Sequence, residues 1–186
     1  MSDLVHCTAF AGLRRIAGGS LADVALAAKT ALAADPSVAV LVFDDATGRV
    51  VDLDLRGEAR EIAARYAPAE GARPRGRPRL GVVAREVTLL PRHWDWLNAQ
   101  PGGASQALRR LVDDARRADH GRTSRRQAQE VAYRFMSAMA GDFAGFEEAS
   151  RALFADDRPR FEAETTSWAE DIRRHARQLA WNDADG

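Results

Sequence analysis

Residues 68–81 read PAEGARPRGRPRLG, and this stretch separates two parts of the chain because it has no hydrophobic periodicity. Pro, Gly, Ala and Arg supply all but two of its residues. Proline and glycine disfavour the interiors of helices and sheets, so this composition predicts an extended linker. We therefore expect an N-terminal domain at residues 1–67, a second unit at 82–118 and a C-terminal helical region at 119–186.

The N-terminal domain has the pattern of a small α+β unit with the element order ββαββα. Short alternating segments predict strands at residues 6–10 and 14–17. Ser20, with Asp23 three residues later, is typical of a helix N-cap. Apolar residues at helical spacing then extend this helix to about Ala34.

A hairpin and a helix complete this domain. Residues 38–43 form a continuous apolar run, which predicts a strand buried on both faces. A turn at 45–48 leads into residues 49–55, where apolar and acidic side chains alternate as in a second strand. Residues 56–67 are predicted to be helical, and Pro68 ends the helix.

After the linker, the pattern predicts a strand, a helix, a turn and a second helix. The strand covers residues 82–90, the first helix 91–100 and the second helix 104–117. Together with the N-terminal domain, this strand-helix-helix unit places the chain in the α+β fold class.

Three further helices are expected near residues 126–140, 144–154 and 159–180, and Asp157 is the expected cap of the last one. These helices are predicted to form a C-terminal bundle. Aromatic and methionine side chains at helical spacing are assigned to its core, namely Tyr133, Phe135, Met139, Phe146, Phe154, Phe161 and Trp168.

Positive charge is concentrated in the middle of a chain whose formal net charge is zero. Residues 73–117 hold ten basic and four acidic side chains, a net charge of +6, whereas the regions before and after them each carry −3. A local basic segment of this kind is typical of a surface that binds a polyanion.

The segment Pro74-Arg75-Gly76-Arg77-Pro78 resembles the AT-hook, a short DNA-binding motif. Its prolines favour an extended backbone, and its glycine removes a side chain where the backbone approaches the floor of a groove. The resemblance implies contact with an A·T-rich minor groove through Arg73, Arg75, Gly76, Arg77 and Arg79. Two alternatives remain. The first is a plain interdomain linker, because arginine is the usual basic residue throughout this chain: only Lys29 among the 27 basic residues is a lysine. The second is binding to another polyanion.

Residues 85–112 resemble the ribbon-helix-helix family. In that family, two chains each contribute one strand to a ribbon that enters the major groove, and the start of the second helix holds a phosphate group. The resemblance implies a homodimer in which the solvent face of residues 84–88, including Thr88, reads bases and Ser105 caps the second helix. It also implies a dimer core formed by Ala107, Leu108, Leu111 and Val112. Alternatively, the strand and both helices pack inside one chain.

Several longer segments resemble a bacterial family known as domain of unknown function 2239. The resemblance is carried by FDDATGR at residues 43–49, by LGVVAREVTLLPRHW at 80–94 and by YRFMSAMAGD at 133–142. Shorter segments near the N-terminus, AFAG at 9–12 and RIA at 15–17, agree with it. The resemblance covers nearly the whole chain and implies no particular activity.

No catalytic or cofactor motif stands out, so we expect a protein that is not an enzyme and that carries no cofactor. Adjacent carboxylates such as Asp44 and Asp45 are typical of turns and caps. Asp171 and His175 share a helix face, but no third metal ligand accompanies them, which favours a surface ion pair. The single cysteine, Cys7, is interpreted as a buried, inert thiol.

These patterns favour a DNA-binding homodimer with a role in regulating transcription. A cytoplasmic location is expected, because the chain has neither a signal-peptide pattern nor a membrane-length apolar run. Arg85 and Arg92 are expected to add to the contacts of the arginine-rich segment. The alternative is an adaptor that dimerises through the central unit without DNA binding or catalysis and docks a protein partner on its C-terminal helices.

Overall fold

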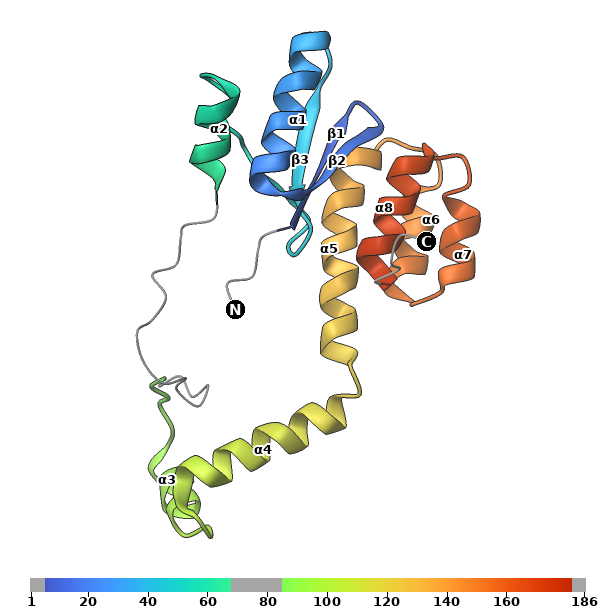
Figure 1. Ribbon diagram of the computed structural model, residues 1–186. Helices are drawn as coiled ribbons and strands as arrows, with labels where there is room; N and C mark the ends of the chain where they lie inside the picture. The colour runs from blue at the N-terminus through green and yellow to red at the C-terminus, as the bar shows by residue number, and fades with distance from the viewer. Residues whose placement is uncertain (1–5, 68–84, 182–186) are drawn as a thin grey trace. The chain divides into compact units, whose positions relative to one another are not determined.

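The computed structural model describes residues 6–67 and 85–181 and divides the chain into two compact units (Figure 1). The first unit combines Met1–Ala69 with Ser124–Gly186, and the second unit is Glu70–Thr123. The N-terminal α+β region and the C-terminal helices therefore belong to the same unit, although the second unit lies between them in the sequence.

A four-stranded antiparallel sheet forms the centre of the first unit. Its strands are β1 (His6–Ala11), β2 (Arg14–Ser20), β3 (Val40–Asp44) and β4 (Arg49–Val50), in the spatial order β2-β1-β3-β4. Helix α1 (Leu21–Ala34) follows β2 directly. The predicted N-cap is confirmed, because the Ser20 hydroxyl accepts a hydrogen bond of 3.2 Å from the backbone N–H of Asp23.

Strand β3 is buried on both faces, as its continuous apolar run predicts. On one face, Val42 packs with Cys7 and Ala9 of β1 and with Val24 of α1. On the other face, Phe43 packs in a core that C-terminal helices share, and its ring centroid lies 5.0 Å from that of Phe135. The sheet is therefore covered by α1 on one side and by C-terminal helices on the other.

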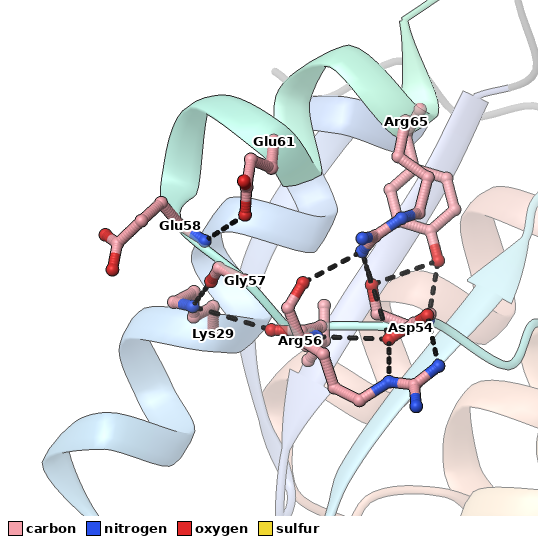
Figure 2. Close-up of polar contacts among 9 residues, drawn as sticks. Lys29, Asp54, Arg56, Gly57, Glu58, Glu61 and Arg65 are labelled. Atoms are coloured by element: carbon pink, nitrogen blue, oxygen red, sulfur yellow. Dashed lines mark hydrogen bonds and ion pairs between the residues drawn. The ribbon is translucent and has the colours of Figure 1, made fainter.

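The second strand of the predicted hairpin is shorter than expected, because β4 contains only two residues. The backbone N–H of Val51 still donates to the carbonyl of Val42 at 2.8 Å, but further along the chain side chains bind the backbone carbonyls, as Figure 2 shows. Arg65 donates hydrogen bonds to the carbonyls of Asp54 at 2.6 Å and Arg56 at 3.1 Å, and Lys29 donates to the carbonyl of Gly57. The Asp54 carboxylate also accepts two bonds from the Arg56 guanidinium, at 2.9 and 2.8 Å.

Helix α2 (Ala59–Tyr66) packs against α1 and is shorter than the predicted helix at 56–67. Its start is fixed by a capping box in which the Glu61 carboxylate accepts a hydrogen bond of 2.8 Å from the backbone N–H of Glu58. The residues before Glu58 belong instead to the polar network around Asp54.

Four helices form the C-terminal part of the first unit: α5 (Arg122–Ala140), α6 (Phe146–Phe154), α7 (Arg158–Glu164) and α8 (Glu170–Trp181). The single helix predicted at 159–180 is therefore two helices. Thr165 donates its hydroxyl to the carbonyl of Phe161 at 2.8 Å, and the Trp168 indole donates to the carbonyl of Ala144 at 2.9 Å. The predicted cap of α7 is confirmed, since the Asp157 carboxylate accepts from the backbone N–H of Arg160.

Most of the aromatic side chains assigned to the core lie there, but two do not. Phe135, Phe161, Met139 and Trp168 are buried, and Phe146 packs against them while partly exposed. Tyr133 and Phe154 were expected in the core and are instead 38% and 50% exposed. They face each other on the outer sides of α5 and α6, with ring centroids 5.4 Å apart.

The second unit contains α3 (Pro91–Asn98) and α4 (Gly103–Asp119), close to the two helices predicted there. Residues 85–90, in contrast, form no regular secondary structure, so the expected strand is absent over the described part of 82–90. A strand is stabilised by hydrogen bonds to a neighbouring strand, and within the described chain no strand pairs with this segment. Among the described residues, no helix is long and apolar enough to cross a membrane.

Candidate functional site

The structure describes four of the nine residues predicted to contact DNA. Arg73, Arg75, Gly76, Arg77 and Arg79, the AT-hook-like group, lie outside the described residues. Arg85 and Thr88 are exposed in the segment that precedes α3, and Arg92 is exposed in the first turn of α3. Ser105 lies in α4.

Ser105 does not cap α4. The N-cap is Gly102, which adopts a left-handed conformation with φ of 81°, and the helix begins at Gly103. Ser105 is therefore the third residue of the helix, and its side chain is exposed. The two consecutive glycines permit a turn that starts the helix earlier than a serine cap would.

An apolar groove of about 320 Å³ lies between α3 and α4. It is lined by Leu89, His93, Trp96, Leu97, Leu108 and Leu111. Trp96 remains 50% exposed and Leu111 43% exposed. Among the described residues of this unit, 85–123, only Leu97 and Ala107 are buried, so α3 and α4 do not enclose a core between them.

The predicted dimer core coincides in part with this exposed surface. Ala107 is buried within the single chain and Leu108 is half-buried, whereas Leu111 and Val112 are exposed, Val112 by 55%. We use the name apolar face for the groove residues together with Val112.

Helix α4 also carries four exposed arginines. Arg109 and Arg116 are seven residues apart, as are Arg110 and Arg117, so each pair lies on one side of the helix. Arg117 pairs with Asp114 of the same helix. The helix is therefore amphipathic, with an apolar face along one side and a surface rich in arginine along the other.

A cluster of polar side chains lies in the first unit, and the sequence did not predict it. The Asp45 carboxylate, in the turn after β3, has its Oδ2 atom 2.6 Å from Nδ1 of His6. The buried hydroxyl of Thr8 donates to the same Oδ2 atom at 2.9 Å. Antiparallel pairing of β1 with β3 brings these residues together, because Cys7 lies opposite Asp44.

His175 of α8 approaches the other oxygen of this carboxylate. Its Nε2 atom lies 3.5 Å from Asp45 Oδ1, and its side chain is only 4% exposed. The imidazole packs between the rings of Phe10 and Phe135, at centroid distances of 5.5 and 4.7 Å. Neither His175 nitrogen nor Asp45 Oδ1 has a hydrogen-bond partner among the described residues.

The predicted surface ion pair between Asp171 and His175 is wrong. His175 is buried, and Asp171 instead accepts a hydrogen bond of 2.9 Å from the backbone N–H of Arg15 and pairs with Arg174 at 2.5 Å. In the part of the chain that the structure describes, no three His, Cys, Asp or Glu side chains are placed to hold a metal ion.

The electrostatics of the cluster favour an ionised Asp45. Burial raises the pKa of this carboxyl, but the imidazoles of His175 and His6 and the hydroxyl of Thr8 lower it by more, and the net pKa lies below the ordinary value of 3.8. The pKa of the Cys7 thiol is shifted upward instead. Burial, followed by the charges of Asp44 and Asp45, raises this pKa to about 11. The expectation of a buried cysteine is confirmed.

A cleft of about 260 Å³ opens beside the cluster. His6, Thr8, Arg15, Asp45, His175 and Gln178 line it with polar groups. Asp45 is 18% exposed and His6 is 60% exposed, so both are accessible from outside. We call this feature the polar cleft.

Comparison with known proteins identifies one family. A family model described as "Uncharacterized protein conserved in bacteria (DUF2239)" matches residues 6–180, which is nearly the whole chain. The match confirms the whole-chain resemblance and leaves the AT-hook and ribbon-helix-helix resemblances unconfirmed. No curated protein and no solved structure matches the chain.

Proposed function

The chain belongs to the DUF2239 family of bacterial proteins, and we propose that this member binds DNA as a homodimer through its second unit. In this proposal two copies join along the apolar face, and the basic segment at residues 73–117 contacts the duplex. A role in regulating transcription and a cytoplasmic location are parts of the same proposal.

The observation that carries the proposal is the exposed apolar face. The described part of this unit buries only Leu97 and Ala107, so the unit gains stability if a partner covers Trp96, Leu111 and Val112. Fully burying a large apolar side chain contributes about 1.5–3 kcal/mol, and covering one that is already half buried contributes about half of that. A second copy of the chain presents the same apolar side chains, and such a self-complementary contact is usual in dimers with twofold symmetry.

Charge supports DNA as the ligand of such a dimer. Residues 73–117 carry a net charge of +6 within a neutral chain, and a dimer presents this segment twice. Arginines neutralise phosphate groups and release counterions, so affinity should fall as salt rises, with a slope of about 0.9 in log affinity per phosphate contacted. The AT-hook-like residues around Arg75 and Arg77 would then enter a minor groove.

Protein–protein interaction without DNA is the second candidate, in which the chain dimerises through the central unit and acts as an adaptor. It is favoured by the exposed pair formed by Tyr133 and Phe154 on the first unit, which offers a separate aromatic contact for a protein partner.

Titration of the full chain with A·T-rich and G·C-rich duplexes at two salt concentrations separates these candidates. DNA binding predicts salt-sensitive affinity, with a preference for A·T that is lost in the Arg75→Ala/Arg77→Ala variant. The matched control is Arg60→Ala/Arg126→Ala, which removes two exposed arginines outside the central segment and leaves the preference unchanged. Absence of salt-sensitive binding to either duplex would refute the DNA-binding proposal.

A further inference from the structure

We propose that the polar cleft is an acid–base site in which His6 exchanges a proton with a small acyl ester and water, catalysing hydrolysis. All residues of this site belong to the first unit, so the proposed reaction does not depend on DNA binding by the second unit.

The position of the proton on His6 follows from its partner. An ionised carboxylate has no proton to donate, so Asp45 Oδ2 can only accept in its 2.6 Å contact with His6 Nδ1. Nδ1 must therefore carry the hydrogen. In the neutral imidazole, Nε2 is then left as a basic nitrogen that Asp45 does not engage. The same carboxylate–imidazole pairing orients the base of a hydrolytic triad.

Neighbouring side chains position the Asp45 carboxylate beside His6. The Thr8 hydroxyl donates to Asp45 Oδ2 at 2.9 Å, and the buried His175 imidazole faces Oδ1 at 3.5 Å. Asp45 is thus held by Thr8 of the sheet, and His175 of α8 lies near its other oxygen without a hydrogen bond, while the His6 side chain remains 60% exposed beside the cleft. In this arrangement His6 is the catalytic residue, and Asp45 is a positioning residue that acts through it.

The reaction requires no cofactor and no oxidant. His6 Nε2 accepts a proton from water while the water oxygen bonds to the acyl carbon. When the bond from that carbon to the alcohol oxygen breaks, Nε2 returns the proton to the departing alkoxide. A carboxylic acid and an alcohol leave, His6 is restored, and Asp45 remains ionised throughout.

The size and lining of the cleft set the class of substrate. The cleft, with a volume of about 260 Å³, has room for a small acyl group. Arg15 and Gln178 also line the cleft and make its wall polar, which suits a small polar ester better than a hydrocarbon. Small carboxylic esters therefore fit the available chemistry.

The test measures hydrolysis of p-nitrophenyl acetate by the full chain and by two matched variants. His6→Asn should lose about 100-fold of the rate above the buffer background. His120→Asn removes an exposed histidine of the second unit at a left-handed position that asparagine tolerates, and should keep the full rate. Equal rates for the wild-type and His6→Asn proteins would overturn the proposal.

A second measurement reads the imidazole directly. Proton–nitrogen correlation spectra of the wild-type chain should show neutral His6 protonated at Nδ1, and Asp45→Asn should abolish that preference and lower the rate of hydrolysis. Asp45→Glu should restore part of the preference for Nδ1 and part of the rate of hydrolysis, because it restores the carboxylate. A wild-type His6 protonated at Nε2 would refute the proposed geometry, whatever the rate.

Discussion

Gly48 lies so close to the carbonyl of Val131 that a Cβ atom added at residue 48 would stand 2.2 Å from the carbonyl oxygen. Gly48 belongs to the turn between β3 and β4, and Val131 belongs to α5, so this contact joins the two sequence regions that make up the first unit. A hydrogen bond of 3.0 Å from Arg134 to the carbonyl of Thr47 supports the same junction.

Gly48→Ala is predicted to destabilise the first unit by about 2–5 kcal/mol, because it adds a clash with backbone to the cost of a left-handed conformation. Gly12→Ala is the control: Gly12 also has a positive φ, of 56°, but nothing lies within 4 Å of an added Cβ atom. It should cost only about 1–2 kcal/mol. Denaturant unfolding measures both values, and equal losses would contradict the close contact.

Phe135→Ala should lower the free energy of unfolding by about 3–5 kcal/mol, because Phe135 is fully buried against Phe10 and Phe43. The matched variant Phe154→Ala removes a ring that is 50% exposed and should cost about 1 kcal/mol or less. Unfolding followed by circular dichroism compares the two. Similar small losses would mean that the sheet and α5 do not share a core.

The lowered pKa of Asp45 predicts a dependence of stability on pH. Its folded-state pKa lies below its unfolded value, so the ionised carboxyl stabilises the fold above about pH 4. This contribution is lost as the pH falls through the folded-state pKa. Unfolding measured from pH 6 downward should therefore show a steeper loss for the wild type than for Asp45→Asn. Asp142→Asn, which changes an exposed carboxyl elsewhere, should follow the wild-type curve.

In the proposed homodimer, Leu111→Asp should give a folded monomer, because Leu111 is 43% exposed on the apolar face through which the two copies would join. Leu13→Asp makes the same change at a side chain that is 48% exposed on the first unit and should leave the dimer intact. Sedimentation equilibrium distinguishes these outcomes. A monomeric wild-type protein would refute dimerisation through this face.

Local patterns predict the elements whose stabilising contacts are themselves local. Ser20 and Asp23 place the start of α1 correctly, and Pro91 places the start of α3. The apolar run at residues 38–43 correctly predicts a strand covered on both faces, because each face of a fully buried strand must be apolar.

Long-range contacts account for what the sequence could not predict. His6, Asp45 and His175 come from a strand, a turn and the last helix, and only the pairing of β1 with β3 and the packing of α8 bring them together. Asp44 and Asp45 are adjacent, as carboxylates in an ordinary turn often are, so the sequence does not indicate that Asp45 belongs to a polar cluster. Likewise, the bond from Trp168 to the carbonyl of Ala144 gives no signal in the local pattern of 159–180.

The shared core of the first unit also sets an order of events during synthesis. Phe43 is synthesised about ninety residues before Phe135, and Phe10 earlier still, although Phe135 completes their packing. At a rate of ~5–20 residues per second, the nascent sheet waits roughly 5–20 s with one apolar face uncovered. That apolar face is therefore covered only after α5 has been made.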